Sequence, residues 1–171
     1  MSRLFAIALM FLTIPACARP DYGARVVGVS DGDTITVLTA NKTRQRIRLY
    51  GVDAPETRQD FGSKAKRVAS AMCFGKTVTI RPHDKDRYGR VVAEVILPDG
   101  RNLGREMVSQ GLAWWYRQYA PSDNDLYRRQ SYARKKRLGL WSQRNPIPPW
   151  EYRKARRPQT ANPRTASRSR R

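Results

Sequence analysis

The chain has 171 residues, with 34 lysines and arginines against 14 aspartates and glutamates, and a formal net charge of +20. This length allows one domain with a substantial core, and the charge predicts binding to polyanions, either nucleic acid or an anionic membrane. One histidine, His83, and two cysteines, Cys17 and Cys73, are too few for a zinc site, which needs three or four such ligands. Any metal must be held by carboxylate and carbonyl oxygens, which suit calcium or magnesium.

Residues 1–18 are typical of an export signal. The basic residue Arg3 precedes an apolar run from Leu4 to Ile14, which is too short to cross a bilayer as a stable helix. Ala16-Cys17-Ala18 fits a cleavage site with small residues, and the segment ending at Cys17 also resembles a bacterial lipobox, from which Pro15 departs. We expect an exported protein, periplasmic or secreted, with a lipoprotein anchored through Cys17 as the alternative.

Residues 19–150 have the mixed apolar and polar periodicity of a globular domain. Segments rich in Val, Ile and Thr predict five strands, and Asp31-Gly32 and Ala40-Asn41 supply the turns that join the first three into a meander. The strands are expected at residues 25–29, 34–39, 44–50, 76–81 and 91–97.

Three helices are expected in the same domain. Apolar residues recur at helical spacing in the first helix, where Cys73 is expected to pack in the core. Asn102 and Ser122 are suited to be the N-caps of the second and third helices. The helices are expected at residues 63–74, 103–110 and 122–138. Five strands with a helix after the third follow the order of an OB-type barrel, so we predict an α+β fold: a five-stranded OB-fold β-barrel with about three α-helices.

Residues 151–171 differ in composition, with eight Lys or Arg, one Glu and no aliphatic residue larger than Ala. Such a segment cannot bury enough apolar surface to offset the entropy lost on ordering, so we predict a disordered basic tail. This tail would either add affinity for nucleic acid or remain solvated. Trp141, Trp150 and the prolines between them are expected to fasten the C-terminal segment onto the core.

Charged residues at the ends of predicted strands carry the candidate chemistry. Asp33 starts one strand and Asp53 follows a neighbouring one, so their carboxylates would repel each other unless a cation lay between them. Glu56 follows a proline that fixes the local turn and can direct its carboxylate to the same ion. Arg48 and Arg90 lie where two guanidinium groups would face that ion and bind a phosphate whose charge grows in the transition state.

Each of these features also has a structural explanation, because Asp-Gly-Asp alone is usually a turn and an arginine in a strand is usually solvated. Their joint occurrence on this strand plan favours a catalytic site. The segments resemble the thermonuclease family, also called staphylococcal nuclease-like proteins, over residues 25 to about 145. The matching stretches are Asp31-Gly32-Asp33-Thr34, Arg48-Leu49-Tyr50-Gly51-Val52-Asp53-Ala54-Pro55-Glu56-Thr57, Asp86-Arg87-Tyr88-Gly89-Arg90, Gly111-Leu112-Ala113 and Leu138-Gly139-Leu140-Trp141.

The resemblance implies a monomeric, calcium-dependent nuclease that hydrolyses phosphodiester bonds of DNA and RNA with little sequence specificity. Water would attack phosphorus in line, and the products would end in 3′-phosphate. By the same resemblance, the carboxylates of Asp33 and Asp53 and the backbone carbonyl of Ala54 would be the Ca²⁺ ligands.

The resemblance also implies the remaining roles. Glu56 would orient or deprotonate the attacking water, while Arg48 and Arg90 would bind the scissile phosphate and stabilise the pentacoordinate state. The nucleotide pocket would be lined by Arg87, Tyr88 and Tyr119. The loop from Thr57 to Gly62 is shorter than in the best-known relative, which bears on substrate preference but not on the catalytic set.

Two rival functions fit the composition alone. The first is a non-catalytic barrel that binds nucleic acid, and the second is a cationic surface protein that binds lipid headgroups or cell-wall anions. Trp114, Trp115 and Tyr116 also allow two interpretations, stacking on bases or packing between barrel and helix, and packing is favoured for the tryptophans.

Overall fold

The computed structural model describes residues 19–156 of the chain. The predicted export signal, including the choice between cleavage and lipidation at Cys17, lies outside these residues. Within residues 19–156, no helix is long and apolar enough to cross a membrane.

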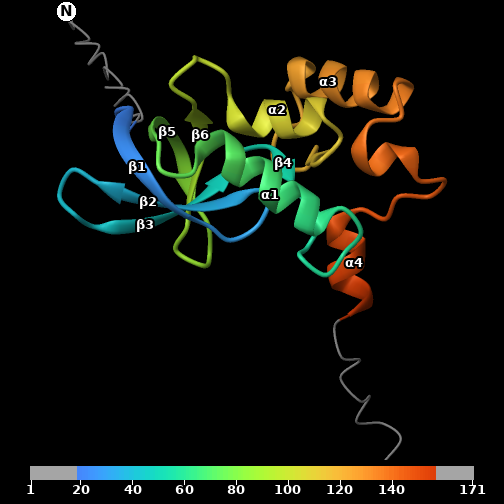
Figure 1. Ribbon diagram of the computed structural model, residues 1–171, viewed down its shortest axis with the longest axis horizontal. Coiled ribbons are helices and arrows are strands. Elements are labelled where there is room, and N and C mark those ends of the chain that lie inside the picture. Colours follow the sequence, from blue (N-terminus) through green and yellow to red (C-terminus); the bar gives the residue numbers. More distant parts are fainter. Residues whose placement is uncertain (1–18, 157–171) are drawn as a thin grey trace, which may run out of the picture.

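Five strands form a closed barrel in the order β1-β2-β3-β6-β5 (Figure 1). All neighbouring strands are antiparallel except β3 and β6, which run parallel. The predicted α+β barrel is therefore confirmed, with strand boundaries that differ by a few residues. The barrel strands are β1 (Tyr22–Val29), β2 (Thr34–Thr39), β3 (Arg44–Leu49), β5 (Thr77–Lys85) and β6 (Val91–Ile96).

The side chains of β3 point alternately into the barrel and outward. Ile47 and Leu49 are buried in the core. Because successive side chains in a strand point to opposite faces, Arg44, Arg46 and Arg48 share the outer face. The core and the functional surface thus use alternate residues of the same strand.

Helices α1 (Gly62–Cys73) and α2 (Leu103–Ser109) pack against the barrel, and α3 (Asn124–Lys135) packs against α2. The predictions for these three helices hold with corrections at their ends. Asn102 caps α2 as predicted, since its side chain accepts a hydrogen bond from the Arg105 N–H. Ser122 is not the cap of α3: the Asp123 side chain accepts hydrogen bonds from the Asp125 and Leu126 N–H groups instead. The helix ends at Lys135, before Arg137 adopts a left-handed conformation with φ 51°.

Cys73 is fully buried at the end of α1, as predicted from the apolar face of that helix. Its thiol donates to the Ala69 carbonyl at 3.0 Å. Burial raises the pKa of Cys73 to about 11, so the thiol stays protonated at neutral pH. Its role in the described part of the chain is packing.

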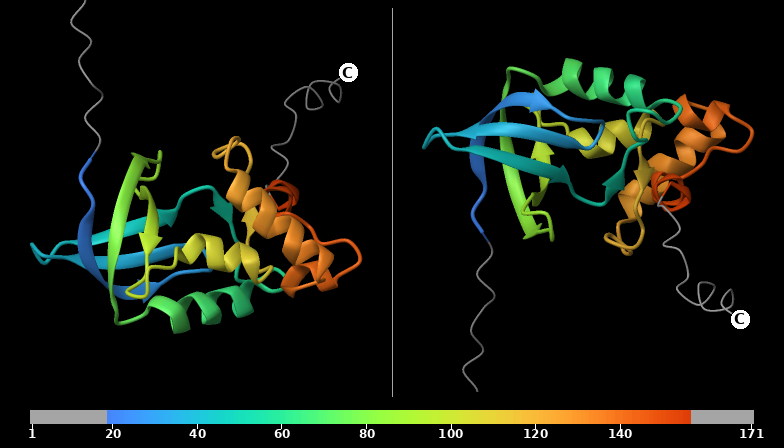
Figure 2. Two further views of the ribbon diagram at one scale, coloured as in Figure 1. Left: turned by 90° about the horizontal axis from the view of Figure 1, so that it is seen from above. Right: turned by 90° about the horizontal axis from the view of Figure 1, so that it is seen from below.

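The structure adds four short elements that the sequence did not predict. β4 (Val52–Asp53) and β7 (Trp114–Trp115) form a separate two-stranded sheet, and η1 (Gly139–Ser142) is a 3₁₀ turn. The last element, α4 (Pro149–Ala155), lies near α3 at the end of the molecule opposite the β2–β3 hairpin (Figures 1 and 2).

Helix α4 corrects the predicted start of the disordered tail, because residues 151–155 are helical. The physical reason is tertiary: the Trp150 ring stacks on Tyr116, with centroids 5.1 Å apart, and meets Trp114 edge-on at 5.6 Å. The fastening role expected for Trp150 is therefore confirmed. Trp141, which is 9% exposed and packs edge-on against Trp114, has the same role. Residues 157–171 of the predicted tail lie outside the described part of the chain.

The start of α1 packs against the backbone at Glu56 without any room for a side chain. A Cβ atom added to Gly62 would lie 1.8 Å from the carbonyl oxygen of Glu56. Backbone cannot yield as a flexible side chain does, so one of the two segments would have to move.

We predict that Gly62→Ala lowers the free energy of unfolding by about 3 kcal/mol, the upper part of the usual range for overpacking. Urea denaturation followed by circular dichroism measures this change. Gly23→Ala is the matched control, because the nearest atom to a Cβ there is 4.0 Å away. Equal stabilities of the two variants would contradict the close approach.

Candidate active site

Two aspartates that the sequence singled out are both buried at one end of the barrel. Asp33, immediately before β2, is 5% exposed, and Asp53, at the end of β4, is 1% exposed. Asp33 Oδ2 accepts a hydrogen bond from the Ala54 N–H at 2.5 Å, and Asp33 Oδ1 accepts one from Thr34 Oγ1 at 3.1 Å. These contacts bring the three predicted metal-binding residues together.

One arginine joins the two carboxylates. Arg48 Nη1 lies 2.5 Å from Asp33 Oδ2, and Arg48 Nη2 lies 2.7 Å from Asp53 Oδ1. The pairing of β2 with β3 sets this arrangement, since Thr34 is directly opposite Arg48. Burial opposes the charge on Arg48, but the carboxylates of Asp33 and Asp53 outweigh it and raise the pKa of Arg48.

A second guanidinium, that of Arg153 in α4, reaches the carboxylates of this site. Arg153 Nη2 lies 2.8 Å from Asp53 Oδ2, and Arg153 Nη1 lies 2.8 Å from Glu56 Oε1. Burial opposes its charge, yet the hydrogen bonds to Asp53 and Glu56 raise the pKa of Arg153 above its ordinary value. The sequence analysis missed this residue because it placed position 153 in a disordered tail, and a lone arginine among many gave no signal.

Arg90 approaches from the start of β6. Its Nε lies 2.6 Å from Asp86 Oδ2, and its Nη1 donates to Thr34 Oγ1 at 3.4 Å, which links it to Asp33. Burial alone would raise the pKa of Asp86, but the hydrogen bonds from Arg90 lower it, so this carboxylate stays ionised and holds Arg90 in place.

The three predicted nucleotide-binding residues lie on the rim of the same region. Tyr88 is exposed, with Arg87 Nη2 donating to its hydroxyl at 2.8 Å. Tyr119 is also exposed and meets Tyr116 edge-on at 4.8 Å. A single cleft of about 1570 Å³ contains all nine residues that the sequence predicted as site residues. They are Asp33, Arg48, Asp53, Ala54, Glu56, Arg87, Tyr88, Arg90 and Tyr119.

The tryptophans beside this cleft pack against protein groups and expose little surface to a ligand. Trp114 is 7% exposed and lies against Trp141, in agreement with the packing interpretation. Trp115 is half-buried, and its indole N–H donates to the Ala120 carbonyl at 2.9 Å. Tyr116 is half-buried and stacks on Trp150, so Tyr119 is the exposed aromatic residue of this segment.

Asp31 is a further acidic residue of the cleft, which the sequence analysis placed in a turn and in a family-matching stretch without assigning it a role. Its Oδ1 accepts from the Asp33 N–H at 3.0 Å. Burial, followed by the charge of Asp33, raises the pKa of Asp31 to about 7. Burial also raises the pKa of Asp53, and the contacts with Arg153 and Arg48 offset this only in part. Burial therefore makes the charged forms of these two carboxyl groups costly, and a cation bound beside them would favour those forms.

The donor atoms fit a hard divalent cation, which binds oxygen ligands. Four acidic side chains lie around two arginines in this part of the cleft. The acidic residues are Asp31, Asp33, Asp53 and Glu56, and the arginines are Arg48 and Arg153. No group of three or more His, Cys, Asp or Glu side chains in residues 19–156 is arranged to hold a metal by itself. Backbone carbonyl, water or substrate oxygens would thus complete the coordination of calcium or magnesium.

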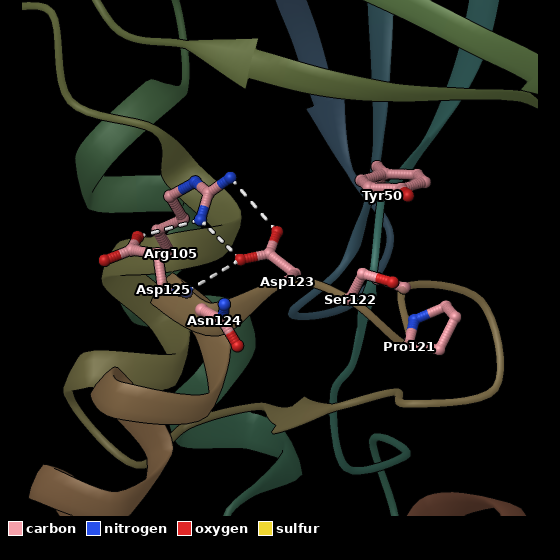
Figure 3. Close-up of a pocket in the computed structure, with 8 residues that line it drawn as sticks. Tyr50, Arg105, Pro121, Ser122, Asp123, Asn124 and Asp125 are labelled. Carbon is pink, nitrogen blue, oxygen red and sulfur yellow. Dashed lines mark hydrogen bonds and ion pairs between the residues drawn. The ribbon is translucent and has the colours of Figure 1, made fainter.

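A smaller pocket nearby has its charges already satisfied. Arg105 donates to Asp123 at 3.0 and 3.1 Å and to Asp125 at 2.8 Å, which ties α2 to the start of α3 (Figure 3). Tyr50 faces this pocket from the barrel and stacks on His83 at 3.9 Å. Because its charged groups pair with one another, we assign this pocket a structural role.

Comparison with known proteins gives a consistent result. Residues 46–143, more than half of the chain, match the family described as Staphylococcal nuclease homologue. A protein of Escherichia coli described as "Uncharacterized endonuclease" is 42% identical over 154 residues, which cover 90% of this chain and 98% of that protein. A Haemophilus influenzae protein with the same description is 41% identical over 152 residues, covering 88% of this chain and 84% of its own length.

A further relative is described more specifically. The "Micrococcal nuclease" of Shigella flexneri is 40% identical over 159 residues, which cover 88% of this chain and 90% of that protein. These likenesses favour an enzyme over the two rival functions, the non-catalytic barrel and the cationic surface protein. By its fold, its cleft and its sequence, this chain belongs to the staphylococcal nuclease family and is a nuclease, a hydrolase of phosphodiester bonds.

Proposed function

We propose that this nuclease depends on calcium and cleaves both DNA and RNA, with water attacking phosphorus in line and the 5′-oxygen leaving, so that products end in 3′-phosphate. The observation that carries this proposal is the cluster around Asp33 and Asp53. Two buried carboxylates, a third acid in Glu56 and two arginines, Arg48 and Arg90, line one cleft. These residues are suited to bind a cation and a phosphate and to orient a water molecule.

The carboxylates of Asp33 and Asp53 and the carbonyl of Ala54 would hold the cation. Bound there, calcium would supply Lewis acidity and a template for phosphate and water. The donors are all oxygen atoms, which calcium prefers. No zinc is expected, because thiolates and imidazoles are absent from the lining apart from His83.

The arginines are suited to the phosphate by the way they are held. Asp86 binds Arg90 through its Nε, so the terminal nitrogens project away from that contact. Arg90 Nη2 makes no hydrogen bond within residues 19–156, which leaves a donor for a phosphate oxygen. Arg48 lies beside the carboxylates and would add a second donor. Glu56, at the cleft edge, would orient the water or accept its proton.

Binding of the polymer would extend along the outer face of β3. Arg44, Arg46 and Arg48 alternate on that face, and Arg46 lines the cleft beside Arg48. Neither Arg44 nor Arg46 forms an ion pair with any residue in the described part of the chain. Unpaired guanidinium groups in a row are suited to successive backbone phosphates, which favours binding with little sequence preference.

We expect plasmid DNA and RNA to be cleaved with calcium and to stay intact with excess chelator. Arg48→Ala and Arg90→Ala should each lower kcat/KM at least about 100-fold, since one charge-stabilising donor contributes on the order of 3 kcal/mol to the transition state. Steady-state assays, with mass spectrometry of product ends, measure both effects.

Arg101→Ala is the matched control, because within residues 19–156 Arg101 pairs with Asp99 and Glu106 and with no residue of the cleft. Cleavage that continues in chelator would contradict the calcium requirement. Near-normal turnover of either arginine variant, with an unchanged circular dichroism spectrum, would contradict the phosphate-binding roles.

We also predict that Arg46→Ala weakens binding about equally for unrelated sequences and reduces the slope of log affinity against log salt by about 1. Fluorescence anisotropy of labelled oligonucleotides in chelator, at several salt concentrations, measures this slope. Arg67→Ala, which removes an exposed arginine of α1 outside the cleft, should leave the slope unchanged. The same loss in both variants would show that the charge of the whole protein, rather than β3, determines binding.

A further inference from the structure

Helix α4 lies outside residues 46–143, the part of the chain that matches the family, yet it contributes a side chain to the cleft. Three contacts dock it. Trp150 stacks on Tyr116 and meets Trp114 edge-on, and the Tyr152 hydroxyl donates to the Arg58 carbonyl at 3.2 Å. A seven-residue helix is marginal in isolation, so these contacts fix where it lies.

The guanidinium of Arg153 spans two acidic residues with different neighbours. Its Nη1 lies 3.3 Å from Asp53 Oδ1 and 2.8 Å from Glu56 Oε1, while its Nη2 lies 2.8 Å from Asp53 Oδ2. Asp53 is also held by Arg48. Within residues 19–156, the carboxylate of Glu56 has Arg153 as its one hydrogen-bond partner.

This difference matters for a residue that acts on water. The Glu56 side chain is 39% exposed, and an exposed glutamate samples several rotamers unless a partner restricts it. A planar guanidinium that binds Asp53 with both terminal nitrogens can hold a second carboxylate at a fixed position beside it. Arg153 thereby sets the separation of Glu56 from Asp53.

We propose that Arg153 is a positioning residue of this nuclease, which holds the Glu56 carboxylate beside Asp53 in the orientation that directs the attacking water. Helix α4 is then part of the active site. This inference rests on the role proposed for Glu56. Arg153 itself acts through Glu56 and makes no contact with the reacting atoms.

The main alternative is that the ion pairs only fasten α4 to the domain. In that case the loss of Arg153 would affect stability and docking, but it would not change turnover by the bound enzyme. A second alternative is that Arg153 only supports the metal site. In that case its loss would lower both the affinity for the cation and the turnover rate. The two alternatives predict different results: the first predicts unchanged turnover, and the second predicts weaker cation binding together with slower turnover.

The experiment compares Arg153→Ala and Arg153→Lys in the full chain, by steady-state cleavage of a labelled oligonucleotide at saturating calcium. We expect kcat to fall about 10- to 100-fold in Arg153→Ala, since a small misplacement of a catalytic group can cost about 100-fold, while KM changes less than about threefold. Arg153→Lys should recover part of kcat, because lysine retains the positive charge. The recovery should be incomplete, because lysine lacks the planar guanidinium that can bind two carboxylates at once. Calcium titration calorimetry without nucleic acid should give an affinity no weaker than wild type, because a positive charge beside the ligands has been removed.

Two further variants serve as controls. Arg156→Ala removes the same charge from the end of α4, where Arg156 contacts the hydroxyl and ring of Tyr152 and forms no ion pair within residues 19–156, and should leave kcat unchanged. Trp150→Ala should release α4 and lower kcat in the same way as Arg153→Ala. Unchanged kcat in Arg153→Ala, an equal loss in Arg156→Ala, or a fall in kcat matched by weaker calcium binding would each overturn the inference.

Glu56→Gln separates failure of this inference from failure of the proposed function. If Glu56→Gln retains wild-type kcat, the proposed role of Glu56 is wrong and the inference falls with it. If Glu56→Gln loses activity and Arg153→Ala does not, only the inference fails. A double variant should be no slower than Glu56→Gln alone, because Arg153 is proposed to act through that carboxylate.

Discussion

The burial of two like charges at one end of the barrel is the constraint on which the rest of this structure depends. Asp33 and Asp53 are almost inaccessible to water, and carboxylates in that position are costly unless positive groups neutralise them. Arg48 from β3 and Arg153 from α4 provide part of the compensation. A cation bound beside the two carboxylates would add to this compensation, which connects the electrostatics of the fold with the chemistry of a nuclease.

The barrel positions these charges through the same alternation that builds its core. Ile47 and Leu49 face inward, and their neighbour Arg48 must therefore face outward, opposite Thr34 and next to Asp33. A shift of the β2–β3 register by one residue would exchange the two faces and bury the arginines. Core packing and placement of the phosphate-binding groups are thus enforced by one pairing, and the row of arginines on β3 follows from it.

The C-terminal helix and the cleft stabilise each other. Helix α4 is too short to persist by itself, and it is held by the ring of Trp150 and by the ion pairs of Arg153. In return, Arg153 pairs with Glu56, which is more exposed than Asp33 and Asp53. The family-matching segment carries the candidate site residues from Arg48 to Tyr119, whereas Asp33 lies before it. The segment beyond it carries Arg153, which contacts Asp53 and Glu56.

Local patterns in the sequence were sufficient for the five strands, the OB-type order of strands and helix, and the Asn102 cap, because strand alternation, turns and caps depend on neighbours in the chain. The charged residues at strand ends singled out Asp33, Arg48, Asp53, Glu56 and Arg90, whereas the other four site residues came from the resemblance to the thermonuclease family. The path of α4, the ion pairs of Arg153 and the burial of Asp31 depended on the tertiary structure. Arg153 contacts residues 97 and 100 positions away. Composition made its segment look like a disordered tail, since a sequence pattern cannot reveal that Trp150 finds an aromatic surface on which to stack. Contacts of that range exist only once the barrel has closed and brought its acidic end to the C-terminal segment.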